Sequence, residues 1–262
     1  AHQVSMMGAH HAISGAAAWV AITSTAPYTL GLDPLPASSV VVGSLVTAGA
    51  ALLPDVDHHN GTIAHSGGLV TRAAAAVTQT ASGGHRHGMH SILAVVGFTL
   101  GAVALGRWEA QVPVFGTIPA GSALLLLALV AFATKALRIS RGGIVKLWTG
   151  AAVVVAGVLW FAPDQLAWLP LSVMVGVIVH LLGDMLTKGG VPLLWPWIPK
   201  PSKAWSATPF LSRLWMKNGY MAVPVLGRTG SKREWVLCVG LTAYTGYALL
   251  ATTGLLVVSP VA

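Results

Sequence analysis

The chain has 262 residues, of which 8% are charged and 55% hydrophobic, and its mean hydropathy is +0.73. A soluble globular protein normally carries roughly 25% charged residues, so this composition excludes the soluble class and indicates an integral membrane protein. The formal charge is +8, which in a membrane protein reports topology and contact with anionic lipid rather than nucleic-acid binding. The single cysteine, Cys238, excludes a disulfide framework and a cysteine-based zinc site.

Seven uncharged runs are long enough, or nearly so, for a spanning helix, which needs roughly 20 apolar residues. They cover residues 12–32, 35–53, 88–106, 110–134, 147–163, 165–183 and 235–262. The first residues lack the basic stretch of a secretory signal, so we expect the first run to be a retained helix. Pro27, Pro113 and Pro119 are expected to mark helix ends. The sequence therefore predicts one all-α integral membrane domain over residues 1–262, a polytopic protein with about seven transmembrane helices.

Two segments, 54–87 and 188–234, are expected as loops or interfacial segments at one membrane face. If the seven runs alternate, these segments share that face with the N-terminus and with residues 135–146. All Lys and Arg residues except Arg107 then lie on this face, and the positive-inside rule makes it cytoplasmic. We expect a protein of a bacterial-type cytoplasmic membrane with its N-terminus inside. All ten histidines fall on or near the same face, which indicates a shared polar site there.

Carboxylates and imidazoles follow the second run directly, in Leu52-Leu53-Pro54-Asp55-Val56-Asp57-His58-His59. Charged groups in apolar surroundings pair, become neutral or bind metal, because isolated ones are costly. In the sixth run, His180 and Asp184 lie four residues apart and therefore share one helical face. A simple His–Asp hydrogen bond is one interpretation of this pair. The other is a metal that takes one imidazole and one carboxylate.

The third run opens with Gly84-His85-Arg86-His87-Gly88-Met89-His90-Ser91. His85 and His90 converge only if the turn between them is bent, whereas His87 and His90 share a face if the helix has already begun. Arg86 suits an anionic group such as a phosphate, which a guanidinium grips with two bonds. Alternatively, Arg86 is an ordinary interfacial anchor. His10 or His11 can reach the same cluster from the start of the first run.

These residues form a mixed oxygen and nitrogen set with enough ligands for one or two divalent ions, zinc first and manganese or iron as alternatives. The expected metal ligands are His11, Asp55, Asp57, His58, His85, His90, His180 and Asp184. The expected catalytic residues are Asp57, His85 and Arg86, with an Asp or His that is not on the metal as general base and Arg86 holding substrate charge. Whether His65 or His87 is a further ligand stays open.

In these motifs the chain resembles the YdjM-like, LexA-regulated membrane-bound metal-dependent hydrolases. The pattern of that family is an N-terminal His, Leu-Leu-Pro-Asp-x-Asp-His, His-Arg-x3-His-Ser, His-x3-Asp-x2-Thr, a Leu-Trp-Pro-like block and Thr-Gly-Ser-x2-Glu. Here these blocks fall at residues 11, 52–58, 85–91, 180–187, 190–196 and 229–234, in the family's order. The chain departs from the pattern at His87, where the family usually has Gly, and at Met89, where it commonly has Thr. The resemblance implies metal-dependent hydrolysis and leaves the substrate open.

We therefore expect a membrane-embedded hydrolase with its metal site at the cytoplasmic ends of the helices, using a metal-activated water. A site below the interface favours a lipid or lipid-linked substrate, first of all a phosphoester. The expected partners are membrane lipids and this substrate, with no nucleic acid. The basic, Trp-containing segment 188–234 should lie on lipid headgroups.

Two alternatives belong to other classes. A metal-ion or proton transporter would place ionisable residues near the membrane midplane and use broken helices. A non-catalytic membrane protein with a structural metal would fill every coordination position with protein atoms.

Overall fold

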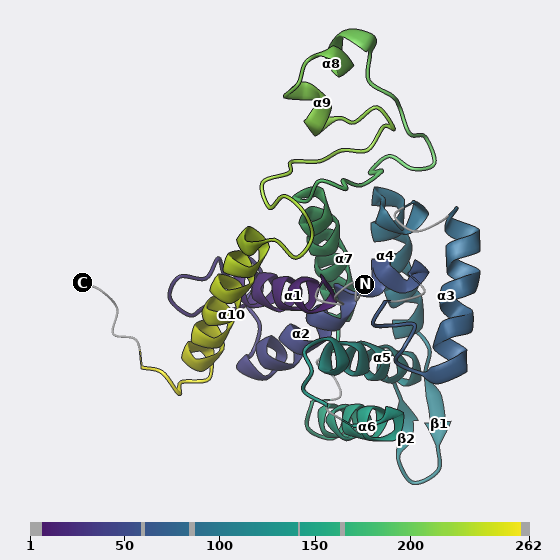
Figure 1. Ribbon diagram of the computed structural model, residues 1–262. Coiled ribbons are helices and arrows are strands. Elements are labelled where there is room, and N and C mark those ends of the chain that lie inside the picture. Colours follow the sequence, from purple (N-terminus) through teal and green to yellow (C-terminus); the bar gives the residue numbers. More distant parts are fainter. Residues whose placement is uncertain (1–6, 59–60, 84–86, 141, 163–165, 258–262) are drawn as a thin grey trace.

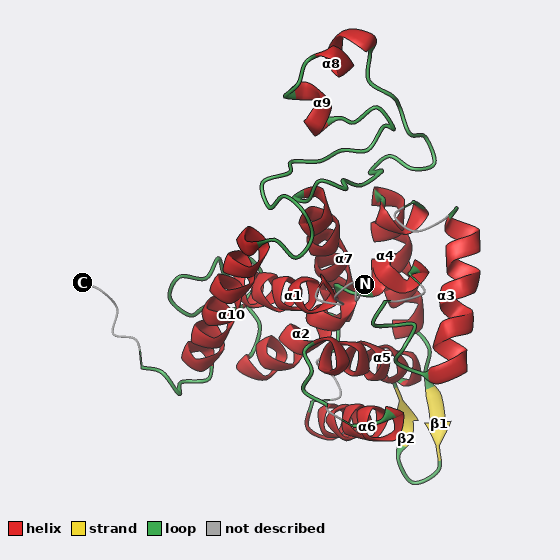
Figure 2. Cartoon of the chain, in the orientation of Figure 1, coloured by secondary structure: helices red, strands yellow, loops and turns green. Residues whose placement is uncertain are grey.

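The computed structural model describes residues 7–58, 61–83, 87–140, 142–162 and 166–257, and these residues fold mainly as helices (Figures 1 and 2). The α-helices of this part are α1 (Met7–Thr23), α2 (Ala37–Ala50), α3 (Gly68–Ser82), α4 (Ile92–Gly106), α5 (Ala120–Ala136), α6 (Ile144–Phe161), α7 (Leu169–Met185), α8 (Lys203–Ala207), α9 (Leu211–Leu214) and α10 (Lys232–Thr252). Two short 3-10 turns are η1 (Leu53–Asp57) and η2 (Gly88–His90). One antiparallel hairpin joins β1 (Ala110–Val112) to β2 (Gly116–Ile118).

Each of the seven apolar runs overlaps one of the longer helices: α1, α2, α4, α5, α6, α7 or α10. Three stretches are long and apolar enough to cross a membrane, namely Ala37–Asp57, Ile144–Phe161 and Lys232–Thr252. Three shorter apolar helices are Ile92–Gly106, Ala120–Ala136 and Leu169–Met185. The helical class is thus confirmed, whereas the number of seven spans and the side on which the N-terminus lies stay predictions.

One segment differs from the sequence-based expectation. The run 110–134 begins with a hairpin rather than a helix, because proline removes a backbone donor and ends helices; α5 starts directly after its N-cap, Pro119. The segment 54–87, expected as a loop or interfacial segment, includes the helix α3, and its position at the membrane face stays a prediction. Its alanine-rich sequence favours a helix, and Gly83 ends it in the left-handed conformation with a φ of 83°.

The core forms around α2, which packs against α1, α5 and α7. Small residues allow these helices to approach closely. A Cβ on Gly176 of α7 would lie 2.7 Å from Ala51 N, at the end of α2. Because α7 can come this close, its polar residues reach the chain that leaves α2.

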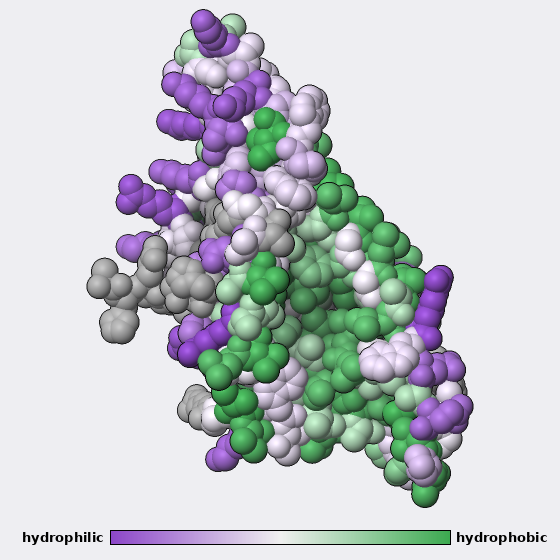
Figure 3. Space-filling model, turned by 90° about the vertical axis from the view of Figure 1, so that its right-hand side faces the viewer, coloured by the Kyte–Doolittle hydropathy of each residue, from purple (hydrophilic) through white to green (hydrophobic). Residues whose placement is uncertain are grey.

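The outer surfaces of α4, α6 and α10 are apolar and exposed. Exposed side chains include Leu100 on α4, Val153 and Trp160 on α6, and Val236 and Val239 on α10. Figure 3 shows apolar residues over a broad part of one face, whereas hydrophilic residues gather at the top, along the left side and at the lower right. An apolar surface of this extent is the one that lipid chains cover.

The segment between α7 and α10 forms an arm that extends away from the helices and carries α8 and α9 (top of Figure 1). Its tip is held by two tryptophans: Trp205 Nε1 donates to Leu211 O (2.8 Å) and Trp215 Nε1 donates to Pro199 O (3.0 Å). At its base, Leu193 O accepts a hydrogen bond from Ile92 N (2.9 Å). The arm is therefore attached to the start of α4, next to η2.

Candidate metal centre

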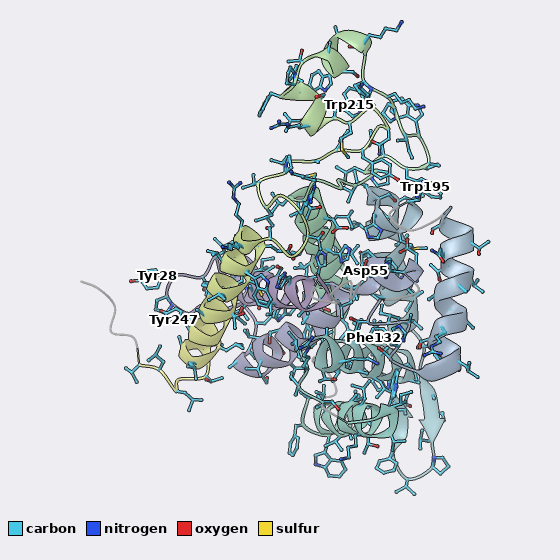
Figure 4. All side chains as sticks on the ribbon, viewed as in Figure 1. Tyr28, Asp55, Phe132, Trp195, Trp215 and Tyr247 are labelled. Carbon is cyan, nitrogen blue, oxygen red and sulfur yellow. The ribbon has the colours of Figure 1, made fainter. Side chains whose placement is uncertain are left out.

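Four segments that are far apart in the sequence meet inside the helical body. The first turns of α1 contribute His11, η1 contributes Asp55 and Asp57, η2 contributes His90, and the last turns of α7 contribute His180 and Asp184. Asp55 lies in the middle of the body in Figure 4. Side chains from distant segments thus share one polar centre.

The two short 3-10 turns, η1 and η2, set the directions of the Asp55, Asp57 and His90 side chains. Pro54 opens η1, whose bonds run from Asp55 N to Leu52 O (3.1 Å) and from His58 N to Asp55 O (3.0 Å). In η2, His90 N donates to His87 O (3.0 Å). The backbone therefore bends immediately before α4; whether His85 converges with His90, as the bent turn was expected to allow, lies outside the described residues.

Four ligand atoms converge. His90 Nε2 and His180 Nε2 lie 3.2 Å apart. Asp55 Oδ1 lies 3.7 Å from His90 Nε2 and 3.8 Å from His180 Nε2, and Asp184 Oδ2 lies 3.5 Å and 3.8 Å from the same two atoms. A tetrahedral ion with bonds of roughly 2.0–2.1 Å separates its ligand atoms by about 3.4 Å. Asp55, His90 and His180 therefore form one group able to hold an ion, and Asp184 lies beside the two imidazoles.

The imidazoles of His180 and His90 also have neighbours at Nδ1, on the side of each ring opposite to the converging Nε2 atom. His180 Nδ1 lies 2.7 Å from Ala51 O, so Nδ1 carries the hydrogen and Nε2 keeps its lone pair. His90 Nδ1 faces Asp57 Oδ2 at 3.9 Å. Asp57 Oδ2 is thus within ion-pair range of the second ring nitrogen, the position through which metal-binding histidines are usually held. Asp57, expected as a ligand, thus lies behind His90 rather than beside Asp55.

His11 approaches from the other side of Asp184. Its Nε2 lies 3.4 Å from Asp184 Oδ1, and its ring stacks on that of His180 with centroids 3.9 Å apart. Gly183 leaves room for this ring, because a Cβ there would lie 3.0 Å from His11 Cε1. His11, His180 and Asp184 form a second group able to hold an ion. Asp184 turns one oxygen to each group, but the two groups share His180, whose Nε2 lone pair can complete only one of them at a time.

The centre is buried except on one side. His90 and His180 are 0% exposed and Asp184 is 1% exposed, whereas the Asp55 side chain is 21% exposed. Of these four side chains, Asp55 is therefore the one that reaches the surface.

The sequence analysis missed one member of the neighbourhood, Glu234 at the start of α10. Its carboxylate pairs with His10 Nδ1 and accepts a hydrogen bond from Gly230 N (2.7 Å). Ser231 accepts a bond from Glu234 N (3.3 Å), which is the capping-box arrangement of Ser-x-x-Glu. That spacing, before an apolar run, was the signal that marks Glu234. Glu234, His10 and His11 line a small cavity of about 40 Å³.

The other expected site residues lie elsewhere. His85 and Arg86 fall outside the described residues, so their roles stay predictions. His58 is half-buried at the end of η1 and, within the described ranges, belongs to neither ligand group. His87 packs against Tyr220 with ring centroids 6.1 Å apart, and His65 is exposed beside Lys135.

Comparison with known families agrees with the motif order. The chain matches the family model described as the YdjM inner membrane protein over residues 6–255. The chain belongs to this family. No match was found among curated proteins or among solved structures. The match to the YdjM inner membrane protein family includes every residue of the centre and also Glu234, so the protein is a membrane protein with a buried His/Asp cluster that could hold a metal.

Replacing Asp57 with Asn is expected to weaken metal binding by about 10–100-fold, the usual effect of removing a partner behind a metal-binding histidine. The ligand atoms remain, but His90 loses the negative charge that faces its Nδ1. Metal content of the purified protein, measured over a series of free metal concentrations, checks this. Asp33→Asn is the matched control, because Asp33 is exposed in a turn. An unchanged affinity in Asp57→Asn would contradict an orienting role.

Proposed function

We propose that this member of the YdjM inner membrane protein family is a metal-dependent hydrolase that cleaves a phosphoester of a lipid or lipid-linked substrate. The observation that carries the proposal is the convergence of His90, His180, Asp55 and Asp184 at the spacing of a single coordination sphere. Two carboxylates in a helical, apolar protein need a compensating charge, and a divalent cation supplies it.

Two imidazoles and two carboxylates suit zinc, and they also suit manganese or iron. When bound, such a cation polarises a phosphoryl oxygen and makes water a nucleophile near neutral pH. Asp55, His90 and His180 would hold the ion as one three-residue group. Catalytic zinc sites commonly have three protein ligands and keep the fourth position open for water or substrate.

The residues of the chain have distinct tasks in this proposal. Asp55, on the exposed side, faces the incoming phosphoester. Ala51 O and Asp57 keep His180 and His90 in the ligand orientation. If one ion is bound between the four ligand atoms, His11 Nε2 is left to take up the proton that the attacking water releases.

A cavity beside His11 supports a role for water in the reaction. Its volume of about 40 Å³ exceeds the roughly 10–15 Å³ that one water requires. Thr187, His10 and Glu234 add polar groups to its lining, which an ordered water needs. This cavity lies between α1, α7 and α10. It is on the side of the metal centre that faces away from η2.

The substrate class follows from the surroundings of the centre. The exposed surfaces of α4, α6 and α10 are apolar, so a substrate with acyl or isoprenoid chains stays in contact with the bilayer while its phosphate reaches Asp55. The positive-inside pattern of Lys and Arg supports a centre at the cytoplasmic face.

Protein purified in detergent without chelator tests the proposal directly. Lipid phosphomonoesters and lipid diphosphates are incubated with it, and released inorganic phosphate is measured. We expect release that stops after chelation and returns with added zinc, manganese or iron(II). Asp184→Asn should bind little metal and release no phosphate.

A second candidate function is a structural metal site, which the position of a fourth side chain, Asp184, beside Asp55, His90 and His180 favours. Protein that retains stoichiometric metal, stays folded and releases no phosphate from any of these lipids would favour this function and contradict the hydrolase.

A further inference from the structure

A second polar pocket lies where the end of α5 meets the loop between η1 and α3. It encloses about 130 Å³ and is lined by Ala9, Gly61, Thr62, His65, Lys135 and Arg138, with Ala136 behind them. We call it the basic pocket. None of its lining residues belongs to the metal centre.

The side chains that line this pocket are basic or neutral. Lys135 and Arg138 contribute two cationic groups, and no Asp or Glu is among the described residues that line it. Lys135 Nζ donates to His65 O, which leaves two of its three hydrogens for another acceptor. In the described ranges, no hydrogen bond or ion pair holds the Arg138 guanidinium. Two cations at one cavity repel each other and attract an anion.

A neutral donor completes the lining. The hydroxyl of Thr62 makes no hydrogen bond to any residue that the structure describes, and it faces the start of α1, where a Cβ on Gly8 would lie 2.7 Å from its Oγ1. A guanidinium fork, an ammonium and a hydroxyl around a cavity are the groups that bind phosphate oxygens. Cations at the end of a helix often only balance its dipole, but that role requires neither the cavity nor the hydroxyl.

The position of the pocket indicates the source of the phosphate. α5 is an apolar helix of 17 residues, and Lys135 and Arg138 come at its very end. The end of an apolar helix lies at the depth of lipid headgroups, where Lys and Arg meet anionic lipid. His65 and Arg138 are exposed, so the pocket opens outward.

We propose that the basic pocket binds the phosphate of an anionic phospholipid headgroup, with Arg138 as its principal contact. The site is separate from the metal centre, and its occupation does not depend on hydrolysis there. The cavity of about 130 Å³ is several times the roughly 10–15 Å³ needed for one water and therefore admits a phosphate group.

The test measures binding to the full-length protein in detergent with chelator present, so that the metal centre does not contribute. The probes are dioctanoyl phosphatidic acid, inorganic phosphate and, as the uncharged analogue, dioctanoylglycerol. We expect phosphatidic acid to bind and dioctanoylglycerol not to compete. Arg138→Gln should weaken phosphatidic acid by roughly tenfold or more, since a hydrogen bond to a charged group is worth about 1.5–3 kcal/mol. Thr62→Val should weaken it several-fold.

Arg107→Gln is the matched control, because Arg107 is also exposed at the end of an apolar helix, α4. It should bind like wild type. Arg138→Lys, which keeps the charge and loses the fork, should lie between wild type and Arg138→Gln. Thermal unfolding of each variant establishes that the fold is kept.

The two sources of phosphate give different patterns that both support the pocket. Competition by inorganic phosphate means that the group alone is recognised, whereas binding of the lipid alone means that the glycerol and chains are also held. Absence of binding by wild type, or equal losses in Arg138→Gln and Arg107→Gln, would overturn the proposal. Loss of binding in Asp184→Asn would overturn it as well, because the ligand would then lie at the metal centre.

Discussion

The His180→Ala protein is expected to purify without its metal and without phosphoesterase activity. The substitution removes Nε2, one of the four converging ligand atoms, and also the bond from Nδ1 to Ala51 O. Removing a partner behind a ligand costs about 10–100-fold in metal affinity, so loss of a ligand itself should exceed about 100-fold. Elemental analysis of the purified protein and the phosphate-release assay measure the two effects.

Two further variants separate ligation from folding. Asp184→Asn keeps the size of the side chain and removes its charge, so it should also lose metal while the protein stays folded. His65→Ala is the control, because His65 is exposed and lies outside the metal centre. Stoichiometric metal in His180→Ala would show that the centre is not where metal binds.

The Glu234→Ala protein is expected to be less stable by about 3–5 kcal/mol, the usual cost of removing one partner of a buried ion pair. Glu234 is 7% exposed and pairs with His10, which is 8% exposed. Few residues of α10 are buried, namely Glu234, Cys238 and Ala248. The attachment of this helix to α1 therefore depends strongly on one side chain.

Chemical unfolding in detergent measures this difference, and limited proteolysis ahead of α10 reports whether the helix detaches first. Glu234→Gln should be intermediate, because an amide oxygen can still accept the bond from Gly230 N. Glu109→Ala is the control, since Glu109 is exposed. A Glu234→Ala protein within about 0.5 kcal/mol of wild type, the range of ordinary surface substitutions, would contradict this account of how α10 is held.

Local spacing predicted the pair on α7 correctly. His180 and Asp184 share a face because an α-helix repeats every 3.6 residues, and their ligand atoms lie 3.8 Å apart. The same spacing could not predict the different positions of Asp55 and Asp57. In a 3-10 turn with three residues per turn, side chains two positions apart point in different directions. Asp55 thus reaches the ligand atoms while Asp57 lies behind His90. The sequence Leu-Pro-Asp-Val-Asp has no periodicity that predicts this turn.

Hydropathy and motif order by themselves determined the helical membrane class and the family, because a bilayer requires long apolar runs and each motif consists of neighbouring residues; the number of membrane spans stays a prediction. Tertiary structure alone decided which polar groups meet. Glu234 reaches His10 across 224 positions in the sequence, and the basic pocket joins α5 to the loop before α3. Such contacts depend on how closely the helices pack, and glycines such as Gly176 allow the close approach. The sequence shows that these positions carry no side chain, but it does not show which helix packs against them.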